Sequence, residues 1–191
     1  MVIFKTGLST PLTETAYDPD HYPNLMVQVY ALEYYKKKAD GDEYSSKIRE
    51  SKTRDLSDFF YPRMQAAFRQ SLQQTGITLI CVVPSSTVGG FSPTMLTIAS
   101  RLTAEFGLTS KNLLRRKIKI QKKMAFLTTA PQRYAAINGT LELIDRPGPS
   151  EKVILLLDDI KTSGTTMLEC TKLLKEAGAQ EVIGLCLGIN K

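Results

Sequence analysis

The stretch VILLLDDIKTSGTTM, residues 153–167, decides the fold. Its five consecutive apolar residues, Val153–Leu157, are typical of a strand that is buried on both faces. Two carboxylates follow, and then small hydroxyl residues surround Gly164. Helical periodicity begins at about Thr165 and continues to Ala177. A buried strand, a short polar turn and a helix in this order predict one unit of an open α/β sheet.

Other segments repeat this arrangement. Continuous apolar runs predict buried strands at Thr78–Val83 and Val182–Leu187. Apolar residues at helical spacing predict helices from Ser57 or Tyr61 to Gln74 and over Pro93–Phe106. We expect Ser92 to cap the second of these helices, and we expect Pro62 to lie in the first turn of the other. Together these segments favour an α/β fold with an open, mainly parallel sheet flanked by helices.

The remaining segments carry weaker patterns. Met26–Leu32 alternates and predicts a strand that could continue to Tyr35. Leu113–Ile120 and Thr140–Ile144 also alternate, and they predict strands of a smaller subdomain or an edge. Residues 1–24 are rich in Pro, Thr and Asp and are expected to be irregular. We therefore divide the chain into a lead-in with hood elements, residues 1–45, and a main domain, residues 46–191.

Composition bounds the class of protein. The chain has 191 residues, of which 42% are hydrophobic, and it lacks both a membrane-length apolar run and the order of a secretory signal. We expect a cytoplasmic protein with no membrane partner. Cys81, Cys170 and Cys186 have neither metal-ligand nor disulfide spacing and are expected to be buried, reduced thiols. His21 is the only histidine, which argues against catalytic sites that pair Cys or Ser with His.

Positive charge is concentrated in one segment. Seven basic residues and no acid lie between residues 111 and 123: Lys111, Arg115, Arg116, Lys117, Lys119, Lys122 and Lys123. Removing these seven from the 25 basic residues leaves 18 against 19 acidic residues. The net charge of +6 therefore reflects a local patch, which predicts an anionic partner.

The turn after residue 157 has the chemistry of an anion site. Backbone N–H groups at a helix N-terminus and a close approach at Gly164 suit a phosphate. Four hydroxyls could add donors: Thr162, Ser163, Thr165 and Thr166. Asp158 and Asp159 would repel a phosphate, so they make sense only if they bind sugar hydroxyls or a metal ion that holds a pyrophosphate. 5-Phosphoribosyl-1-pyrophosphate (PRPP) has all of these parts.

The same stretch resembles the PRPP-binding signature of type I phosphoribosyltransferases. The resemblance implies their fold, with a small hood subdomain, and Mg²⁺ as a cofactor bound together with PRPP. It implies that Asp158 and Asp159 hold the ribose hydroxyls and contact the metal indirectly, and that residues Lys161 to Thr166 surround the 5′-phosphate. Lys161 replaces a residue that is usually apolar, so it would lie near the phosphate or point to solvent. Thr162 replaces the Asp of purine-salvage members, which argues against that activity. The alternative is an ordinary capped strand–loop–helix unit.

The order of features from Ile48 to Ile189 is similar to the ComF-like branch of this superfamily. The resemblance makes Pro84–Phe91 a pyrophosphate loop, with Ser85 and Ser86 as donors. The ComF-like pattern usually has an Arg where this chain has Gly89, and the alternative for the segment is a flexible turn. The N-terminal cysteine cluster of ComF-like proteins is absent, so we predict no zinc.

The basic stretch Arg115–Lys123 matches the place of the mobile hood loop in these enzymes. We therefore predict that Arg115, Arg116 and Lys117 bind substrate, and that the loop shields the sugar phosphate from water. Two alternatives are a solvated strand face and a contact with nucleic acid.

The leading hypothesis is an enzyme that transfers phosphoribosyl from PRPP to a nitrogenous base and releases pyrophosphate. PRPP, a nucleoside monophosphate and the base would be its small-molecule partners, and the resemblance implies a homodimer. The sequence singles out no general base. The alternative is a non-catalytic, ComF-like accessory protein that senses PRPP or nucleotides or associates with nucleic acid.

Overall fold

The computed structural model describes residues 11–37, 41–120 and 127–190. Six strands form one sheet in the order β1-β2-β8-β7-β3-β4. Their bounds are Leu12–Tyr17 (β1), Met26–Tyr35 (β2), Leu79–Val82 (β3), Thr109–Ser110 (β4), Val153–Lys161 (β7) and Glu181–Asn190 (β8). Neighbouring strands are parallel except for β1, which pairs antiparallel with β2 at one edge. The predicted open, mainly parallel sheet is therefore confirmed.

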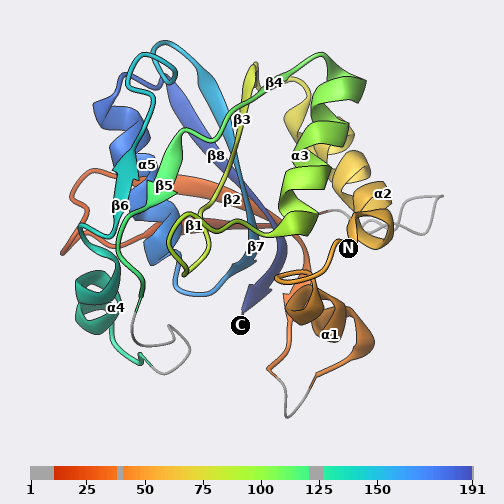
Figure 1. Ribbon diagram of the computed structural model, residues 1–191, viewed down its shortest axis with the longest axis horizontal. Coiled ribbons are helices and arrows are strands. Elements are labelled where there is room, and N and C mark those ends of the chain that lie inside the picture. The colour runs from red at the N-terminus through yellow and green to blue at the C-terminus, as the bar shows by residue number, and fades with distance from the viewer. Residues whose placement is uncertain (1–10, 38–40, 121–126, 191) are drawn as a thin grey trace.

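Helices cover both faces of this sheet (Figure 1). The helices are α1 (Glu43–Glu50), α2 (Ser57–Ala67), α3 (Pro93–Phe106), α4 (Ala130–Ile137) and α5 (Thr165–Glu176). Ile154 and Leu156 of β7 lie in one core cluster with α5, whereas Leu155 and Leu157 lie in a second cluster with α1, α2 and α3. The period of two along a strand directs alternate side chains to opposite faces, and this explains the uninterrupted apolar run.

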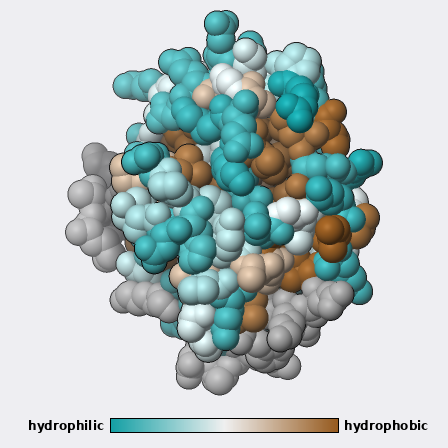
Figure 2. All heavy atoms as spheres, turned by 90° about the vertical axis from the view of Figure 1, so that its left-hand side faces the viewer, coloured by the Kyte–Doolittle hydropathy of each residue, from teal (hydrophilic) through white to brown (hydrophobic). Residues whose placement is uncertain are grey.

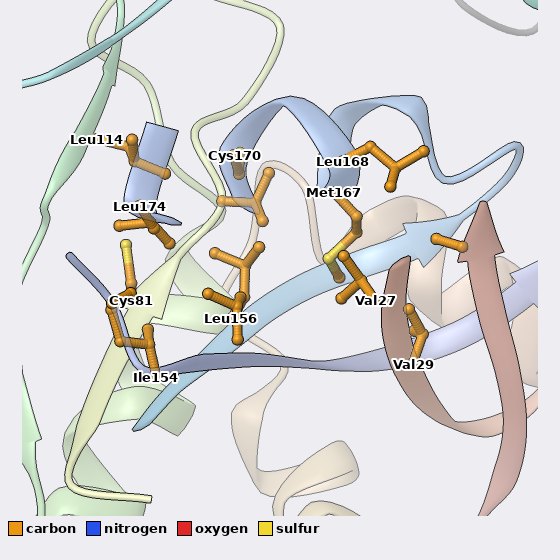
Figure 3. Packing of buried hydrophobic residues seen from close by; sticks show 14 of the residues in the cluster. Val27, Val29, Cys81, Leu114, Ile154, Leu156, Met167, Leu168, Cys170 and Leu174 are labelled. Carbon is orange, nitrogen blue, oxygen red and sulfur yellow. The ribbon is translucent and has the colours of Figure 1, made fainter. Parts of the chain in front are cut away.

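The core under α5 depends on a close approach between helix and sheet. In Figure 3, Met167 of α5 lies beside Val27 and Val29 of β2. Gly184 of β8 makes room for this contact, because a Cβ at that position would lie 3.1 Å from Val29 Cγ2 and 3.2 Å from Met167 Cε. Cys81, Cys170 and Cys186 belong to the same cluster and are buried, unpaired thiols, as predicted.

The end signals of α3 are confirmed, whereas the position of Pro62 is not. Ser92 Oγ accepts a hydrogen bond from Met95 N, Pro93 occupies the first turn, and Gly107 ends the helix with a φ of 67°. The helix α2 begins at Ser57, so Pro62 lies beyond its first turn. The chain then continues as a π-helical turn, Phe68–Leu72. Tertiary packing overrides the local preference here, because Phe60, Met64 and Phe68 are all buried in one core.

Four elements lie where the sequence patterns predict none, and one of them is the two-residue strand β4, Thr109–Ser110. The strand β1 falls within the segment expected to be irregular, and α1 and α4 fall in polar segments. The two helices bury few apolar side chains, chiefly Ile48 in α1 and Ile137 in α4, so neither has a clear apolar stripe. Their caps were the available signal: Asp42 accepts from Ser45 N, and Thr129 forms a capping box with Gln132.

The two alternating segments form a separate two-stranded sheet. They are shorter than predicted, with β5 at Leu114–Arg116 and β6 at Leu141–Leu143, and they pair antiparallel. This small sheet packs through Leu114 and Leu141 onto the core cluster of α5, and its standing as a separate subdomain stays a prediction. β2 also confirms its predicted extension to Tyr35 and pairs with β8. No helix among the described residues has the length and apolarity needed to cross a membrane.

Truncation of Leu156 tests the core. We expect Leu156→Ala to lower the free energy of unfolding by about 2–5 kcal/mol, because it leaves a cavity at a fully buried position of the central strand. Urea denaturation measures this change. Leu96→Ala in α3, where the side chain is 39% exposed, is the control and should cost clearly less. Equal losses in the two variants would contradict the assigned core.

Candidate functional site

The acid pair lies within strand β7 and not in the loop after it. The sequence predicted that the strand ends at Leu157, but β7 continues to Lys161. Asp158 aligns with Cys186 of β8, and Lys161 aligns with Ile189. The long partner β8 provides backbone hydrogen-bond partners for these polar residues, which is why pairing continues past the apolar run. The carboxylates therefore stand on a rigid element.

Asp158 lies in surroundings that disfavour its charge. Its Oδ1 accepts a hydrogen bond of 2.8 Å from Asp159 N. Burial, and then the adjacent charge of Asp159, raise the pKa of Asp158 well above its usual range. A carboxyl that readily keeps its proton can donate to an oxygen as well as accept from a hydroxyl, and both abilities suit contacts with a sugar diol.

Asp159 has a cationic partner that sequence analysis missed. Lys52 Nζ lies 2.9 Å from Asp159 Oδ2, and Asp159 Oδ1 accepts from Ile160 N at 2.7 Å. Burial lowers the pKa of Lys52, but the charges of Asp159 and Asp158 outweigh this effect and raise it overall. Lys52 is about 100 residues from the acid pair along the chain, and no local pattern distinguishes it from the lysines around it.

Lys161 does not point to solvent, which was one of the two positions predicted for it. Its side chain is 7% exposed, and its Nζ donates a 2.6 Å hydrogen bond to Glu14 Oε2 of β1. The alternative that Lys161 points to solvent is therefore wrong, whereas its place near the phosphate stays a prediction, since its Cε would lie 3.5 Å from a Cβ at Gly164. An ammonium buried beside the edge strand needs a carboxylate partner, and Glu14 provides it. This ion pair connects the end of β7 to β1.

The turn between β7 and α5 leaves the start of the helix open. Gly164 is the N-cap, with a φ of 83°, and provides no side-chain cap. Ser163 Oγ lies 2.9 Å from Thr165 Oγ1, Thr162 is exposed, and Thr166 is partly exposed. By contrast, side chains cap α1, α3 and α4. The N–H of Thr165 donates to Ser163 Oγ at 3.5 Å, whereas the following first-turn N–H groups of α5 lack intrahelical partners and can therefore bind an anion.

The strand β1 packs against this turn through Ala16. A Cβ at position 164 would lie 2.8 Å from Ala16 Cβ, which no ordinary packing allows. Gly164 is therefore required both by its left-handed backbone and by the close approach of Ala16. The strand β1, in a segment that was expected to be irregular, thus shapes the turn predicted to bind the phosphate.

The loop Pro84–Phe91 lies at the same edge of the sheet as the acid pair. β3 runs parallel to β7, and Val83 N donates to Leu157 O at 2.8 Å, immediately before the loop Pro84–Phe91 and the acid pair. Ser85 is partly exposed and Ser86 is exposed. Ser85 N donates to Gly90 O, and Ser85 Oγ lies 2.8 Å from Thr87 Oγ1, so the loop is internally bonded. The loop Pro84–Phe91 therefore begins beside the acid pair, whereas the turn at Gly164 follows only after the further strand residues up to Lys161.

Arg116 holds this loop and is almost fully buried, with 1% of its surface exposed. Its Nε donates to Ser85 O at 2.7 Å, its Nη2 to Pro84 O at 3.4 Å, and its Nη1 to Thr140 Oγ1 at 2.5 Å. Burial lowers the pKa of Arg116. The guanidinium thus joins the small sheet to the predicted pyrophosphate loop. Its predicted contact with substrate stays a prediction that competes with these three bonds.

The rest of the basic stretch is partly neutralised. Arg115 donates to Glu142 Oε1 from two nitrogens, at 2.9 and 2.6 Å, and Lys111 lies 3.3 Å from Asp145 Oδ2. Lys117 lines a hollow of about 290 Å³ between β6 and the C-terminal half of α5, the end of that helix away from Gly164. Figure 2 shows this side of the molecule, where hydrophilic side chains predominate and apolar areas lie between them. Residues 121–126, which include Lys122 and Lys123, lie outside the described part of the chain.

The acid pair suits a metal ion only when a bound ligand provides the rest of its coordination. No group of three or more metal-binding side chains occurs among the described residues. Mg²⁺ is commonly held by one or two carboxylates together with substrate phosphates, so the pair Asp158 and Asp159 is compatible with a metal that arrives with a pyrophosphate.

Comparison with known proteins agrees with this geometry. The family model described as phosphoribosyl transferase domain matches residues 96–191, half of the chain. The chain therefore belongs to the phosphoribosyl transferase domain family. The match includes the acid pair and the α5 turn, whereas Lys52 and the loop Pro84–Phe91 lie outside it.

Solved structures give weaker similarities. One is glutamine PRPP amidotransferase from B. subtilis complexed with ADP and GMP, and another is described as the allosteric regulatory enzyme of purine biosynthesis. Each is 21% identical, with a TM-score of 0.39 over 58% of this chain, and this chain spans 22% of each of those chains. The search of curated proteins gives no match.

Substitutions of two neighbouring arginines test whether the buried Arg116 holds the loop Pro84–Phe91 in place. We expect Arg116→Met to lower the free energy of unfolding by at least about 2 kcal/mol, because it removes three charge-assisted bonds and leaves their acceptors buried. Arg115→Met on the same strand removes an exposed ion pair and should cost at most about 1 kcal/mol. Urea denaturation of both variants measures the difference. A similar loss of unfolding free energy in both variants would show that Arg116 does not hold the loop in place.

The raised pKa of Asp158 gives a pH test. Its stabilising contribution is fully present below the ordinary carboxyl pKa and is lost as the pH rises through the raised value, because the folded state binds the proton more tightly. Asp158→Asn should therefore unfold at higher urea than the parent at about pH 8 and show a smaller difference at about pH 5. Asp58→Asn, at a fully exposed side chain, is the control. A parallel pH profile for Asp158→Asn and the parent would refute the raised pKa.

Proposed function

We propose that this protein binds PRPP at the edge of the sheet where β3 and β7 end, and transfers its phosphoribosyl group to a nitrogenous base. The observation that carries the proposal is the acid pair of β7 beside the uncapped start of α5. The α5 amides suit the 5′-phosphate, and the carboxyl groups suit the ribose hydroxyls. Membership of the phosphoribosyl transferase domain family supports this assignment.

The proposed reaction exchanges one bond at C1 of the sugar. A nitrogen lone pair of the base forms the new N–C1 bond, the C1–O bond breaks with inversion, and pyrophosphate leaves with the bonding electron pair. Positive charge develops on the sugar, so the protein mainly orients both reactants. Asp158 and Asp159 would hold the diol in place while the α5 turn fixes the opposite end of the sugar.

Mg²⁺ is the proposed cofactor of this step. When bound with PRPP it would neutralise charge on the departing pyrophosphate. The loop Pro84–Phe91 would contact the same group through Ser85 and Ser86, together with its backbone N–H groups. The hood role of the segment from Arg115 onward, the ComF-like branch and a homodimeric assembly stay predictions.

A second function, sensing of PRPP or nucleotide without turnover, is favoured by one observation. The segment PSSTVGGF contains no basic residue, and the buried Arg116 beside it already serves three protein oxygens. Weak stabilisation of a leaving pyrophosphate would reduce the reaction rate more than ligand binding. A nucleic-acid contact is less favoured than either function, because Lys111 and Arg115 already pair with acidic side chains.

Calorimetry and turnover assays test these proposals together. PRPP with Mg²⁺ should bind the parent protein, and binding should be lost in Asp158→Asn/Asp159→Asn and in Gly164→Ala, where the new Cβ would displace the turn. Asp58→Asn, at an exposed acid, should bind normally. Pyrophosphate release with a panel of free bases measures transfer. Binding without release would favour the sensor, and absence of binding would refute both functions.

A further inference from the structure

Lys52 is a half-exposed cation that contacts the acid pair. Its Nζ lies 2.9 Å from Asp159 Oδ2, yet 51% of its side-chain surface is exposed. Two other cations near this end of the sheet differ from it: Arg116 is buried against carbonyl groups, and Lys161 is buried against Glu14. Lys119 is exposed and lies beside the loop Pro84–Phe91, since Ile120 N donates to Ser86 O at 3.2 Å, but no ion pair joins it to the acid pair among the described residues. Lys52 therefore has an ammonium that can reach a ligand while it stays beside the carboxylates.

The position of Lys52 is set by buried bonds. The turn after α1 is joined to the start of α3, since Ser92 Oγ donates to Ser51 O at 2.8 Å and Thr94 Oγ1 donates to Arg54 O at 2.8 Å. Ser51 and Thr94 are fully buried. Lys52 lies between these two anchored positions, so the backbone that carries it is held against the same helix that follows the loop Pro84–Phe91.

The proposed ligand would extend from one face of the sheet toward the other. The turn at Gly164 leads into α5 on one face, whereas α1, α3 and Lys52 belong to the other face. A sugar phosphate whose 5′-phosphate lies at α5 and whose diol lies over the acid pair would extend its C1 substituent toward Lys52. The same side carries the loop Pro84–Phe91, which lacks a basic residue of its own.

We infer that Lys52 is a binding residue of this site, and that its ammonium contacts the anionic oxygens on the C1 substituent, which in PRPP is pyrophosphate. This inference rests on the proposed function. In the free protein Lys52 pairs with Asp159, and in the complex it shares its three donors between Asp159 and the ligand. It thereby supplies the positive charge that the sequence of the neighbouring loop does not.

Two ligands that differ only at C1 test the inference. Calorimetry with Mg²⁺ at about 0.15 M salt, where long-range charge effects are screened, compares PRPP with ribose 5-phosphate. Lys52→Met should weaken PRPP binding at least about tenfold, the effect of one lost charge-assisted contact, and ribose 5-phosphate binding by less than about threefold. Lys52→Arg, which keeps the charge, should recover most of the PRPP affinity.

Lys36 is a matched control. It forms an ion pair of 3.1 Å with Asp42, and its side chain is 55% exposed, so Lys36→Met removes the same charge from a similar setting. Equal weakening of both ligands in Lys52→Met, or equal effects of Lys52→Met and Lys36→Met on PRPP, would overturn the inference and leave the proposed function intact. If the parent binds neither ligand, the proposed function fails and this inference fails with it.

Discussion

The pairing of β7 between β3 and β8 is the constraint on which the rest of the site depends. Parallel pairing aligns the end of β3 with Leu157 of β7, so the loop Pro84–Phe91 and the acid pair become neighbours although about 70 residues separate them. Continued pairing with β8 keeps Asp158 and Asp159 on ordered backbone. The acid pair is thus held by the same ladder that organises the core, which limits the entropy that ligand binding must remove.

The surroundings of each basic side chain, more than the number of basic residues, decide which positive charges are accessible near the acid pair. The basic stretch contains residues with quite different surroundings, since Arg116 is enclosed by carbonyl groups while Arg115 pairs with Glu142 at the surface. Lys161 and Lys52 each pair with one carboxylate, but only Lys52 remains half-exposed. In the proposed site, the helix amides would therefore carry more of the binding of an anion than the net charge of +6 implies.

Local patterns were sufficient where a segment buries many apolar side chains. β7, β8 and α3 have long apolar runs or stripes, and their positions were predicted to within a few residues. The same reasoning failed for α1 and α4, which bury few apolar groups, and for Pro62, whose helix is stabilised by the core around Phe60 and Met64. Period-based prediction detects burial, so it does not find elements that are stabilised by caps and by contacts distant in sequence.

The sequence by itself determined the α/β class and the order strand, acid pair, glycine turn and helix, because apolar periodicity and the conformational needs of Gly164 are local properties. Only the tertiary structure decided the partner of each charge. Glu14 and Lys161 are 147 residues apart, and Lys52 reaches Asp159 from a turn that buried bonds to Ser92 and Thr94 fix in place. Such pairs depend on how layers pack, and a charged side chain has the same local signature whether it meets a carboxylate, a carbonyl group or water.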